Sequence, residues 1–416
     1  MKTDSERTPG PSEPLFPGTE LPRLRKRISN WFPKNGRDLP WRHTRDPYAV
    51  WVSEIMLQQT TTETVRGYFA RFMARFPTAA ALARAEVSEV LRYWEGLGYY
   101  RRARLMHKTA GIVVERFGGK FPESREEIAS LPGVGRYTTG AILSFALGRR
   151  EPILEANTTR LHARILALEG SPTGADRAKV LWDFAERILP NRNPGLFNQA
   201  LIDLGRTVCL PRSPLCAECP CAPSCRAFAE GRQAEIPPSR PKPKTEYRTE
   251  AAYLVHLSSV TGKKTDAGRL LFLQYQEGLR WAGLWDFPRF LMDSPFLGEI
   301  PRGLEILLGN GLSATGEPVA ETSHAVTRYR IRLVLLDTNG YADGGTLTGM
   351  PSADGAKGEE ARMVEFAGGT ACATSLEYQW LSPEDAEGIP LSSTGRKLVK
   401  FLRKSGTESR EKRQCP

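Results

Sequence analysis

Apolar residues recur at helical spacings over the first half of the chain. In "SEIMLQQTTTETVRGYFARFMARF", which starts at Ser53, they are Ile55, Leu57, Val65, Phe69, Phe72 and Phe76. Repetition every three or four residues is typical of helices with one buried face. In "SREEIASL", Ser124 is followed three residues later by Glu127, the pattern of a capping box at a helix start. "RYTTGAILSFALG" predicts another short helix, ended by Gly148. We therefore predict a mostly helical region over residues 23–228.

The pattern changes after a segment rich in proline and lysine. "IPPSRPKPKTEYRTE", from Ile236 to Glu250, cannot hold a helix, and we predict an extended linker over residues 229–249. Short apolar runs follow, "AAYLVHL" and "RLLFLQY", and then "YRIRLVLLD". This last run places four apolar side chains on one face of a strand, namely Tyr329, Ile331, Leu333 and Leu335. The turn-rich "GLRWAGLWDFP" from Gly278 lies among them. Residues 250–403 thus read as a second, β-containing domain.

Three segments carry no clear periodicity. We expect residues 1–22 to be disordered, the small-residue stretch from Gly340 to about Gly369 to form a mobile loop, and the basic tail 404–416 to be disordered. No apolar run approaches the roughly 18 residues of a membrane helix. The N-terminus also lacks the apolar core of a secretory signal. These features predict an intracellular protein without a membrane partner.

Composition and charge narrow the class of protein only slightly. The chain has 416 residues, of which 40% are hydrophobic and 25% charged, as in soluble proteins of two domains. The net charge of +11 is compatible with binding to a polyanion such as nucleic acid, and also with a merely solvated basic surface.

The cysteines are concentrated in one short segment. Five of the seven lie between Cys209 and Cys225, and four of them follow the spacing Cys209-x6-Cys216-x2-Cys219-x5-Cys225. Four thiolates this close can hold one zinc ion or one iron–sulfur cluster. One Cys-x2-Cys pair flanked by longer spacings favours the iron–sulfur cluster modestly over zinc. With either one, we expect the site to serve mainly as a structural cross-link. Cys221 does not fit the spacing.

Two segments combine turns, aromatic residues and basic charge. "LPGVGRYTTGAI", from Leu131, places Gly133 and Gly135 around Val134, with Arg136 next to them. Two short helices joined by such a turn can hold a DNA phosphate on free backbone amides; the alternative is a plain glycine-capped connection. "EGLGYYRRARLMHK" sets Tyr99 and Tyr100 beside three arginines, which indicates stacking on bases or simply a solvated basic helix.

Together these pieces resemble a known group of enzymes. A helix-hairpin-helix, a small-residue loop after an apolar run and the cysteine spacing are similar to the endonuclease III superfamily of base-excision glycosylases. Several segments resemble its adenine DNA glycosylase branch, the MutY family: "LPWRHTRDPYAVWVSEIMLQQT", "WEGLGYYRRARLMHK", "LPGVGRYTTGAILSFALG", "FNQALIDLGRTVC" and, more loosely, "GLWDFP". The resemblance extends from Arg23 to about Arg403.

The resemblance implies a fold, a cofactor and a partner. The fold would be a mostly α N-terminal part, with a helix-hairpin-helix six-helix barrel domain and an iron–sulfur cluster domain, followed by an α+β Nudix-like domain. The cofactor would be a [4Fe–4S] cluster held by Cys209, Cys216, Cys219 and Cys225. The partner would be double-stranded DNA with adenine opposite 8-oxoguanine or guanine. We expect a monomer in the bacterial cytoplasm, associated with the nucleoid through DNA.

The resemblance also assigns roles to single residues. Glu54 matches the catalytic acid, and Tyr137 takes the hairpin position where glycosylase-lyases carry a nucleophilic lysine. The adenine pocket would be lined by Trp41, Arg42 and Gln199. Contacts to DNA would come from Gln59, which enters the base stack, and from Tyr99, Leu131, Gly133, Val134, Gly135 and Arg136.

The chemistry explains why such residues are needed. An adenine inside a duplex must be flipped out before an enzyme can reach it. It becomes a good leaving group once a ring nitrogen is protonated, and a carboxylic acid whose pKa is raised by burial can supply that proton. Bond cleavage leaves positive charge on the sugar, which a second carboxylate can stabilise.

The candidate for this second carboxylate departs from the family. Where the family has "DGN", this chain has Glu155, Ala156 and Asn157. The charge is kept, and Asn157 can orient it, but the side chain is one methylene longer. A misplacement of about 1 Å can lower a rate on the order of 100-fold. Glu155 as a helix cap only, or an enzyme with impaired catalysis, are the alternatives. We predict that Glu155 takes the role of the aspartate.

The C-terminal part departs as well. The family reads 8-oxoguanine with a phenylalanine–serine–histidine turn, whereas this chain has Val326, Thr327 and Arg328. Thr327 keeps a hydroxyl, and arginine can hydrogen-bond a guanine edge. "GEIPRGLEILLGNGL" echoes a Nudix box without its paired acidic residues, so we expect no phosphohydrolase activity.

Three other functions are compatible with parts of the sequence. A glycosylase with lyase activity needs a lysine for a Schiff base, but no lysine lies between Lys120 and Lys179. A non-catalytic DNA-binding scaffold would not need Glu54, and a zinc module would lack iron–sulfur absorbance. The sequence therefore predicts a monofunctional adenine DNA glycosylase.

Overall fold

A computed structural model describes most of the chain. It covers residues 16–238, 244–257, 268–292, 300–308, 313–342, 363–367, 369–372 and 376–411. The chain divides into two compact units: Met1–Arg84 with Lys108–Pro241, and Ala85–His107 with Lys242–Pro416. Among the described residues, no helix combines the length and the apolar character needed to cross a membrane.

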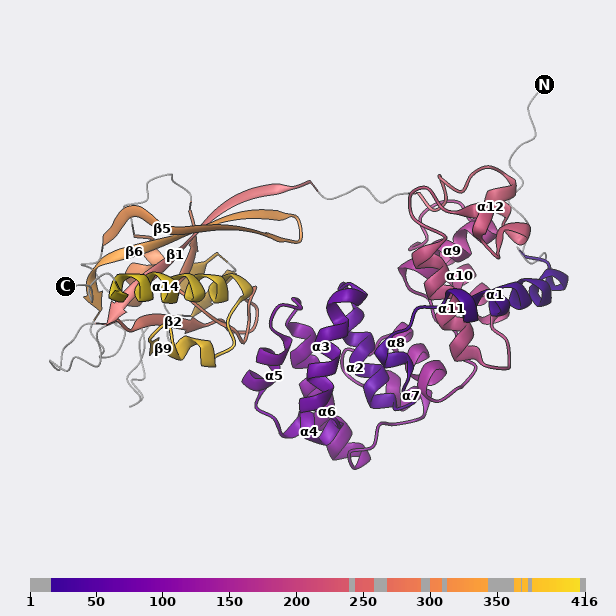
Figure 1. Ribbon diagram of the computed structural model, residues 1–416, viewed down its shortest axis with the longest axis horizontal. Helices are drawn as coiled ribbons and strands as arrows, with labels where there is room; N and C mark the ends of the chain where they lie inside the picture. The colour runs from indigo at the N-terminus through magenta and orange to yellow at the C-terminus, as the bar shows by residue number, and fades with distance from the viewer. Residues whose placement is uncertain are drawn as a thin grey trace, which may run out of the picture. The chain divides into compact units, whose positions relative to one another are not determined.

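The first unit is helical, as predicted (Figure 1). Its α-helices are α1 (Leu21–Asn35), α2 (Pro47–Leu57), α3 (Thr62–Arg75), α4 (Ala79–Arg84), most of α6 (Arg101–Phe117), α7 (Arg125–Ala129), α8 (Arg136–Ala141), α9 (Ala156–Leu166), α10 (Ala175–Ile188), α11 (Pro194–Thr207) and α12 (Arg226–Ala229). Short 3₁₀ turns add Gly18–Glu20, Pro40–Arg42, Cys216–Glu218 and Ala222–Ser224.

Helix α2 is the central helix of this unit. Asp46 caps its first turn by accepting a hydrogen bond from the Tyr48 amide, and Pro47 occupies the first helical position. Every residue from Tyr48 to Met56 is buried, which indicates a helix surrounded by other elements. The periodic stretch after Ser53 is not continuous, because residues 58–61 separate α2 from α3. Gln59 adopts a left-handed φ of 58° there.

The predicted helix after Arg136 changes its winding partway. It begins as α8 and continues through a π-helical turn, Ile142–Ala146, up to Gly148 with its positive φ of 66°. Ser124 caps α7 as the sequence predicts, by accepting the Glu127 amide at 3.2 Å. Single-turn π segments are frequent next to functional sites, and this one lines the cavity described below through Phe145.

Both ends of the helical unit extend beyond the predicted boundaries. Phe16 is buried and packs edge-on against Phe184 at 5.3 Å between ring centroids, and α1 begins at Leu21. Residues 16–22 are therefore ordered, although a polar, proline-containing neighbourhood predicted disorder. At the other end Ile236, the first residue of the proline-rich segment, joins the same core.

The second unit contains α5 (Val87–Trp94) and a mixed sheet. The strands are β1 (Glu246–Leu257), β2 (Leu270–Gln274), β3 (Trp285–Asp286), β4 (Arg289–Leu291), β5 (Ser313–Val326), β6 (Tyr329–Ala342), β7 (Met363–Phe366), β8 (Gly369–Cys372) and β9 (Glu377–Leu381). The main order is β3-β2-β1-β6-β5, with β4 paired to β1 and β9 paired to β2. Strands β1 and β6 are parallel, and the other pairs are antiparallel.

Helices cover both faces of this sheet. Helix α14 (Ser393–Glu411) lies along one face (Figure 1). Its Leu398 and Val399 belong to one core cluster with Ala252 and Leu254 of β1. On the other face α13 (Arg302–Leu308) approaches Phe290 and Val364, next to its Gly303. In β6 the predicted alternation therefore holds only as far as Leu333, because both faces are buried from Leu333 to Leu336.

Three boundaries in this unit differ from the sequence-based prediction. Strand β1 begins at Glu246, inside the predicted linker. In the predicted loop from Gly340 to Gly369, β6 continues to Ala342 and β7 occupies Met363–Phe366, while residues 343–362 and 368 lie outside the described residues. Helix α14 continues to Glu411, beyond the predicted end at residue 403. Pairing with neighbouring strands and packing on the sheet are tertiary effects that composition does not reveal.

Candidate active site

A cavity of about 280 Å³ lies in the helical unit. Its walls bring together residues that the sequence analysis selected from four separate segments: Trp41, Arg42, Glu54, Gln59, Tyr137, Glu155, Asn157 and Gln199. The predicted acid, the predicted second carboxylate and the predicted pocket residues therefore share one site.

Glu54 has the environment expected of an acid. Its side chain comes from the fully buried helix α2, and the residue is only 5% exposed. The hydroxyl of Tyr137 donates to its Oε2 at 2.7 Å. Burial raises the pKa of Glu54 to about 7, with a further contribution from Glu155, although the Tyr137 hydrogen bond and Arg42 oppose the shift. Glu54 can therefore carry a proton near neutral pH.

Glu155 is a helix cap and a cavity residue at once. It is the N-cap of α9, and its Oε1 accepts the amides of Asn157 and Thr158 at 2.9 and 2.8 Å. Its Oε2 accepts the side-chain amide of Asn157 at 3.0 Å. The Thr158 hydroxyl accepts the Glu155 amide in return, which completes a capping box. The capping interpretation is thus correct without excluding the catalytic one, because the same carboxylate lines the cavity.

Sequence reasoning did not identify Arg160, which supports Asn157. Its Nη2 donates to Asn157 Oδ1 at 3.0 Å and to the Gly205 carbonyl at 2.6 Å, and its Nε donates to the Cys209 carbonyl at 2.8 Å. One guanidinium therefore connects the amide that orients Glu155 to the backbone of a cysteine in the cluster segment. Its position in "NTTRLHAR", one turn after Asn157, was the available signal.

A second residue that sequence reasoning missed is Asp203. Its buried carboxylate receives both ends of the Arg42 guanidinium, at 2.7 and 2.9 Å, and also the backbone amide of Arg37 at 2.9 Å. Burial alone would raise the pKa of Asp203, but Arg42 and Arg37 outweigh it and hold the pKa below its ordinary value. The ionised Asp203 fixes the position of Arg42 next to Glu54.

The predicted hairpin has the expected backbone. Helices α7 and α8 are joined by a turn in which Gly133 has a φ of 77° and Val134 is buried. Gly135 is the N-cap of α8, without a side chain that caps the first amides. Arg136 stacks its guanidinium on the ring of Trp182, at 3.7 Å from the centroid. Tyr137 then points from α8 to Glu54.

The cysteine segment folds around one small apolar cavity. The four predicted ligands and Cys221 all contribute to its lining, together with Leu161, Val208 and Ala222. The buried Arg164 donates to Cys209 Sγ at 3.3 Å, to the Leu210 carbonyl at 2.6 Å and to the Ile236 carbonyl at 2.8 Å. Within the described residues, no three or more His, Cys, Asp or Glu side chains are grouped closely enough to bind a metal ion as they stand.

The remaining predicted contacts belong to the second unit. Tyr99 is 51% exposed, with a positive φ of 49°. Thr327 and Arg328 form the tight turn between β5 and β6, where Thr327 has a φ of 50°. Arg328 is engaged by Glu246 at 3.0 Å and by the Tyr329 hydroxyl at 3.0 Å. Beside this turn lies an open cavity of about 730 Å³, bordered by Ser323, His324 and Arg330, which sequence reasoning did not anticipate.

Comparison with known proteins assigns the chain to a family. Residues 52–187 match the model of the "HhH-GPD superfamily base excision DNA repair protein". The adenine DNA glycosylase of Rattus norvegicus is 33% identical over 374 residues, which cover 76% of this chain and 71% of the rat protein. The chain belongs to the adenine DNA glycosylase family.

A second relative agrees with this assignment. The family member of Buchnera aphidicola subsp. Schizaphis graminum (strain Sg) is 42% identical over 216 residues, 52% of this chain and 62% of that protein. Among solved structures, a thermostable thymine-DNA glycosylase is 30% identical and covers 51% of this chain and 98% of its own, with a TM-score of 0.48.

Proposed function

We propose that this protein hydrolyses the N-glycosidic bond of adenine mispaired with 8-oxoguanine or guanine in double-stranded DNA, and that it acts as a monomer. The observation that carries the proposal is the buried Glu54. It is hydrogen-bonded to Tyr137 at 2.7 Å and lies in the same cavity as Glu155. A protonated acid and a second carboxylate at one site suit glycosidic cleavage.

Glu54 is the proton donor in this scheme. With its pKa near 7, a substantial fraction of the side chain is protonated at neutral pH and can transfer the proton to a ring nitrogen of the flipped adenine. The protonated base then leaves as a neutral molecule. Tyr137 donates to the carboxylate and so orients it for the transfer.

Glu155 then stabilises the cationic sugar. The hydrogen bonds from Asn157 and Thr158 fix the carboxylate at the start of α9. The glutamate side chain turns back to its own helix, and we propose that this offsets the extra methylene relative to the family's aspartate. Water completes the hydrolysis at the sugar carbon.

The walls of the cavity suit a flipped base. Its volume of about 280 Å³ is close to the lower end for small-ligand pockets, on the order of 300 Å³. Trp41 offers an aromatic face, while Arg42 and Gln199 offer hydrogen-bond donors. Gln59, with its left-handed backbone at the break after α2, is assigned to the gap that the flipped adenine leaves.

Contacts to the duplex are assigned to the hairpin and to Tyr99. The turn at Gly133 and the amides that follow Gly135 would face a phosphate, and Leu131 and Val134 would support the turn from inside. We also propose that the α+β unit is Nudix-like and reads 8-oxoguanine near Thr327. Both side chains of this turn have internal partners, since Arg328 contacts Glu246 and the Thr327 hydroxyl donates to the Val326 carbonyl at 2.7 Å, so either could exchange its partner for the lesion.

A [4Fe–4S] cluster is proposed for the cysteine segment. Four thiols that converge on one apolar cavity, beside the positive charge of Arg164, are suitable donors for such a cluster. Cys209, Cys216, Cys219 and Cys225 would hold it, after rotation of their side chains into the shared space. When bound, the cluster would act as a structural cross-link, while the residues of the segment orient α9 and α11 through Arg160.

Lyase chemistry has no support at this site. The position of a Schiff-base lysine is taken by Tyr137, and the described residues that line the cavity include no lysine. The enzyme should therefore release adenine and leave an intact abasic strand.

The test is single-turnover cleavage of end-labelled duplexes with adenine opposite 8-oxoguanine, guanine, cytosine or thymine, with and without hot alkali. The proposal requires strand breaks that appear only after alkali and only with adenine opposite 8-oxoguanine or guanine. These breaks should be absent with Glu54→Gln and with Glu155→Gln. Breaks without alkali would show lyase chemistry. Binding without release of adenine would favour the non-catalytic scaffold.

A further inference from the structure

The turn between α5 and α6 has an unusual backbone. Three of its residues have positive φ angles, namely Gly96 at 98°, Gly98 at 72° and Tyr99 at 49°. Such angles are easy for glycine but uncommon for a tyrosine. The Tyr99 side chain is also 51% exposed, with the Arg102 guanidinium 5.5 Å from its ring centroid. A strained turn that presents an aromatic side chain to solvent needs something to hold it.

Bonds within the segment hold part of this turn. The indole of Trp94 donates to the Gly98 carbonyl at 3.0 Å, and Arg102 donates to the same carbonyl at 3.1 Å. The amide of Gly96 donates to the Tyr100 hydroxyl at 3.2 Å. These bonds fix the turn to its own helices, and the amide of Glu95, the residue just before it, donates to the Arg92 carbonyl at 3.2 Å.

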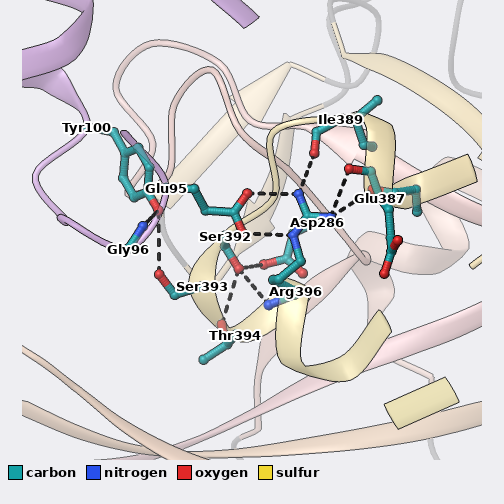
Figure 2. Close-up of polar contacts among 12 residues, drawn as sticks. Glu95, Gly96, Tyr100, Asp286, Glu387, Ile389, Ser392, Ser393, Thr394 and Arg396 are labelled. Carbon is teal, nitrogen blue, oxygen red and sulfur yellow. Dashed lines mark hydrogen bonds and ion pairs between the residues drawn. The ribbon is translucent and has the colours of Figure 1, made fainter. Parts of the chain in front are cut away.

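Glu95 is held by an arginine 301 residues later in the chain (Figure 2). The Nε and Nη2 of Arg396, in α14, donate to the two carboxylate oxygens at 2.7 and 2.8 Å. The side chain of Glu95 is only 18% exposed and that of Arg396 only 15%. A bidentate pair that is largely shielded from water is both directional and stronger than an exposed one.

Arg396 is itself fixed by the sheet-containing part of the same unit. Its other N–H groups donate to carbonyls of one loop, at 3.4 Å to Ala386, 3.1 Å to Glu387 and 2.8 Å to Ile389. Figure 2 shows the guanidinium between this loop and Glu95. Every donor of the guanidinium therefore has an acceptor, and its position does not depend on Glu95 alone.

Neighbouring contacts join the same two segments. Tyr100 and Ser393 approach each other through their hydroxyls at 3.5 Å, and Arg104 donates to the Ala282 carbonyl. Gly283 lies against Leu91 and Arg104, where its positive φ and the absence of a Cβ permit close packing. The segment Ala85–His107 therefore forms one compact unit with the C-terminal sheet.

We propose that Arg396 is a positioning residue that, through Glu95, holds the Gly96–Tyr100 turn in the conformation that presents Tyr99 to DNA. The C-terminal part of the chain would then raise affinity for the duplex by shaping a contact that it does not make itself. This inference rests on the proposed function, since it assumes that Tyr99 contacts the mismatched duplex.

The test compares three full-length variants with the wild type. Arg396→Gln and Glu95→Gln break the pair from either side. Arg403→Gln is the matched control, because it removes the same charge from the same helix but lies against Glu387 instead of Glu95. The measurements are Kd for a duplex with a non-hydrolysable 2′-fluoro adenosine opposite 8-oxoguanine, and the single-turnover rate at saturating DNA.

We expect Kd to rise about tenfold in both pair variants, which is about the effect of losing one hydrogen bond to a charged group. In the control, Kd should stay within about twofold of the wild-type value. The rate at saturating DNA should be unchanged, because Glu54 and Glu155 are untouched. Glu95→Gln leaves the carbonyl contacts of Arg396 in place, so it tests the pair even where Arg396→Gln fails to fold.

A double-mutant cycle with Tyr99→Ala separates positioning from simple stability. If Arg396 acts through Tyr99, Arg396→Gln should weaken binding little further in the Tyr99→Ala background. Pair variants that bind as tightly as Arg403→Gln, or effects that add in full to Tyr99→Ala, would overturn the inference while leaving adenine release by the wild type intact. A wild type that never releases adenine would instead overturn the proposed function.

Discussion

At the scale of single residues, the acidity of Glu54 depends on the charge of Arg42, which Asp203 binds. Burial raises the pKa of Glu54, whereas the positive Arg42 lowers it, and Asp203 neutralises much of that positive charge. We therefore expect the charge of Asp203 to influence the pKa of Glu54 through Arg42. Two measurements of the pH dependence follow from this arrangement.

The rate of adenine release should fall as pH rises through about 7. The protonated form of Glu54 is the active one, and its fraction drops about tenfold for each pH unit above the pKa. A single-turnover series from pH 5.5 to 9 with saturating duplex would measure this descending limb. In Glu54→Gln the limb should disappear together with the rate, and a wild-type rate that increases above pH 7 would contradict the acid role.

Asp203→Asn should move that limb to lower pH. Without the carboxylate, the full charge of Arg42 acts on Glu54, favours its ionised form and lowers its pKa. We also expect reduced thermal stability, since Arg42 and Arg37 lose a buried partner. Asp203→Glu keeps the charge and is the control. A folded Asp203→Asn enzyme with the wild-type midpoint would show that Asp203 has no influence on Glu54.

At the scale of elements, the start of α9 combines catalysis with helix stability. Glu155 caps this helix with two backbone hydrogen bonds and faces the cavity with the same carboxylate. A glutamate is less common than aspartate as an N-cap, yet here the longer side chain still reaches both amides. Mutation can separate the two roles, because they require different properties of the side chain.

Three substitutions of Glu155 should rank differently for the rate of adenine release and for thermal stability, namely those to glutamine, alanine and aspartate. The glutamine keeps an acceptor for the amides but loses the charge, so the rate should fall at least about 100-fold with little change in melting temperature. The alanine should also lose about 1 kcal/mol of stability with the cap. The aspartate should retain activity. Thermal melts beside single-turnover rates measure both, and an active Glu155→Gln would leave capping as the only role.

Elements also show how far sequence reasoning reaches. The resemblance of the motifs around Glu54, Tyr137 and Gln199 to the glycosylase family was sufficient to predict one shared site. The structural supports Arg160 and Asp203 were not predictable, since an arginine or aspartate on a helix is most often solvated. Likewise Phe16 and β7 became ordered through tertiary packing, which local composition does not encode.

At the scale of the whole molecule, the cysteine segment connects distant helices of the first unit. Arg27 of α1 donates to the Pro220 carbonyl at 3.0 Å, Arg164 of α9 contacts Cys209, and Arg160 links the segment to Asn157. A cross-link in this segment would therefore stabilise the first unit and also hold the residues that orient Glu155.

Removing the proposed cluster should thus affect both stability and chemistry. In Cys219→Ser we expect loss of absorbance near 400 nm, a lower melting temperature and a reduced single-turnover rate, because Arg160 no longer has a fixed Cys209 carbonyl. Cys221→Ser is the matched control, since Cys221 lines the same cavity outside the predicted ligand spacing. If Cys219→Ser has the melting temperature of the wild type but no longer releases adenine, the segment affects catalysis without acting as a structural cross-link. If both variants keep the absorbance and the rate, the proposed ligand set is wrong.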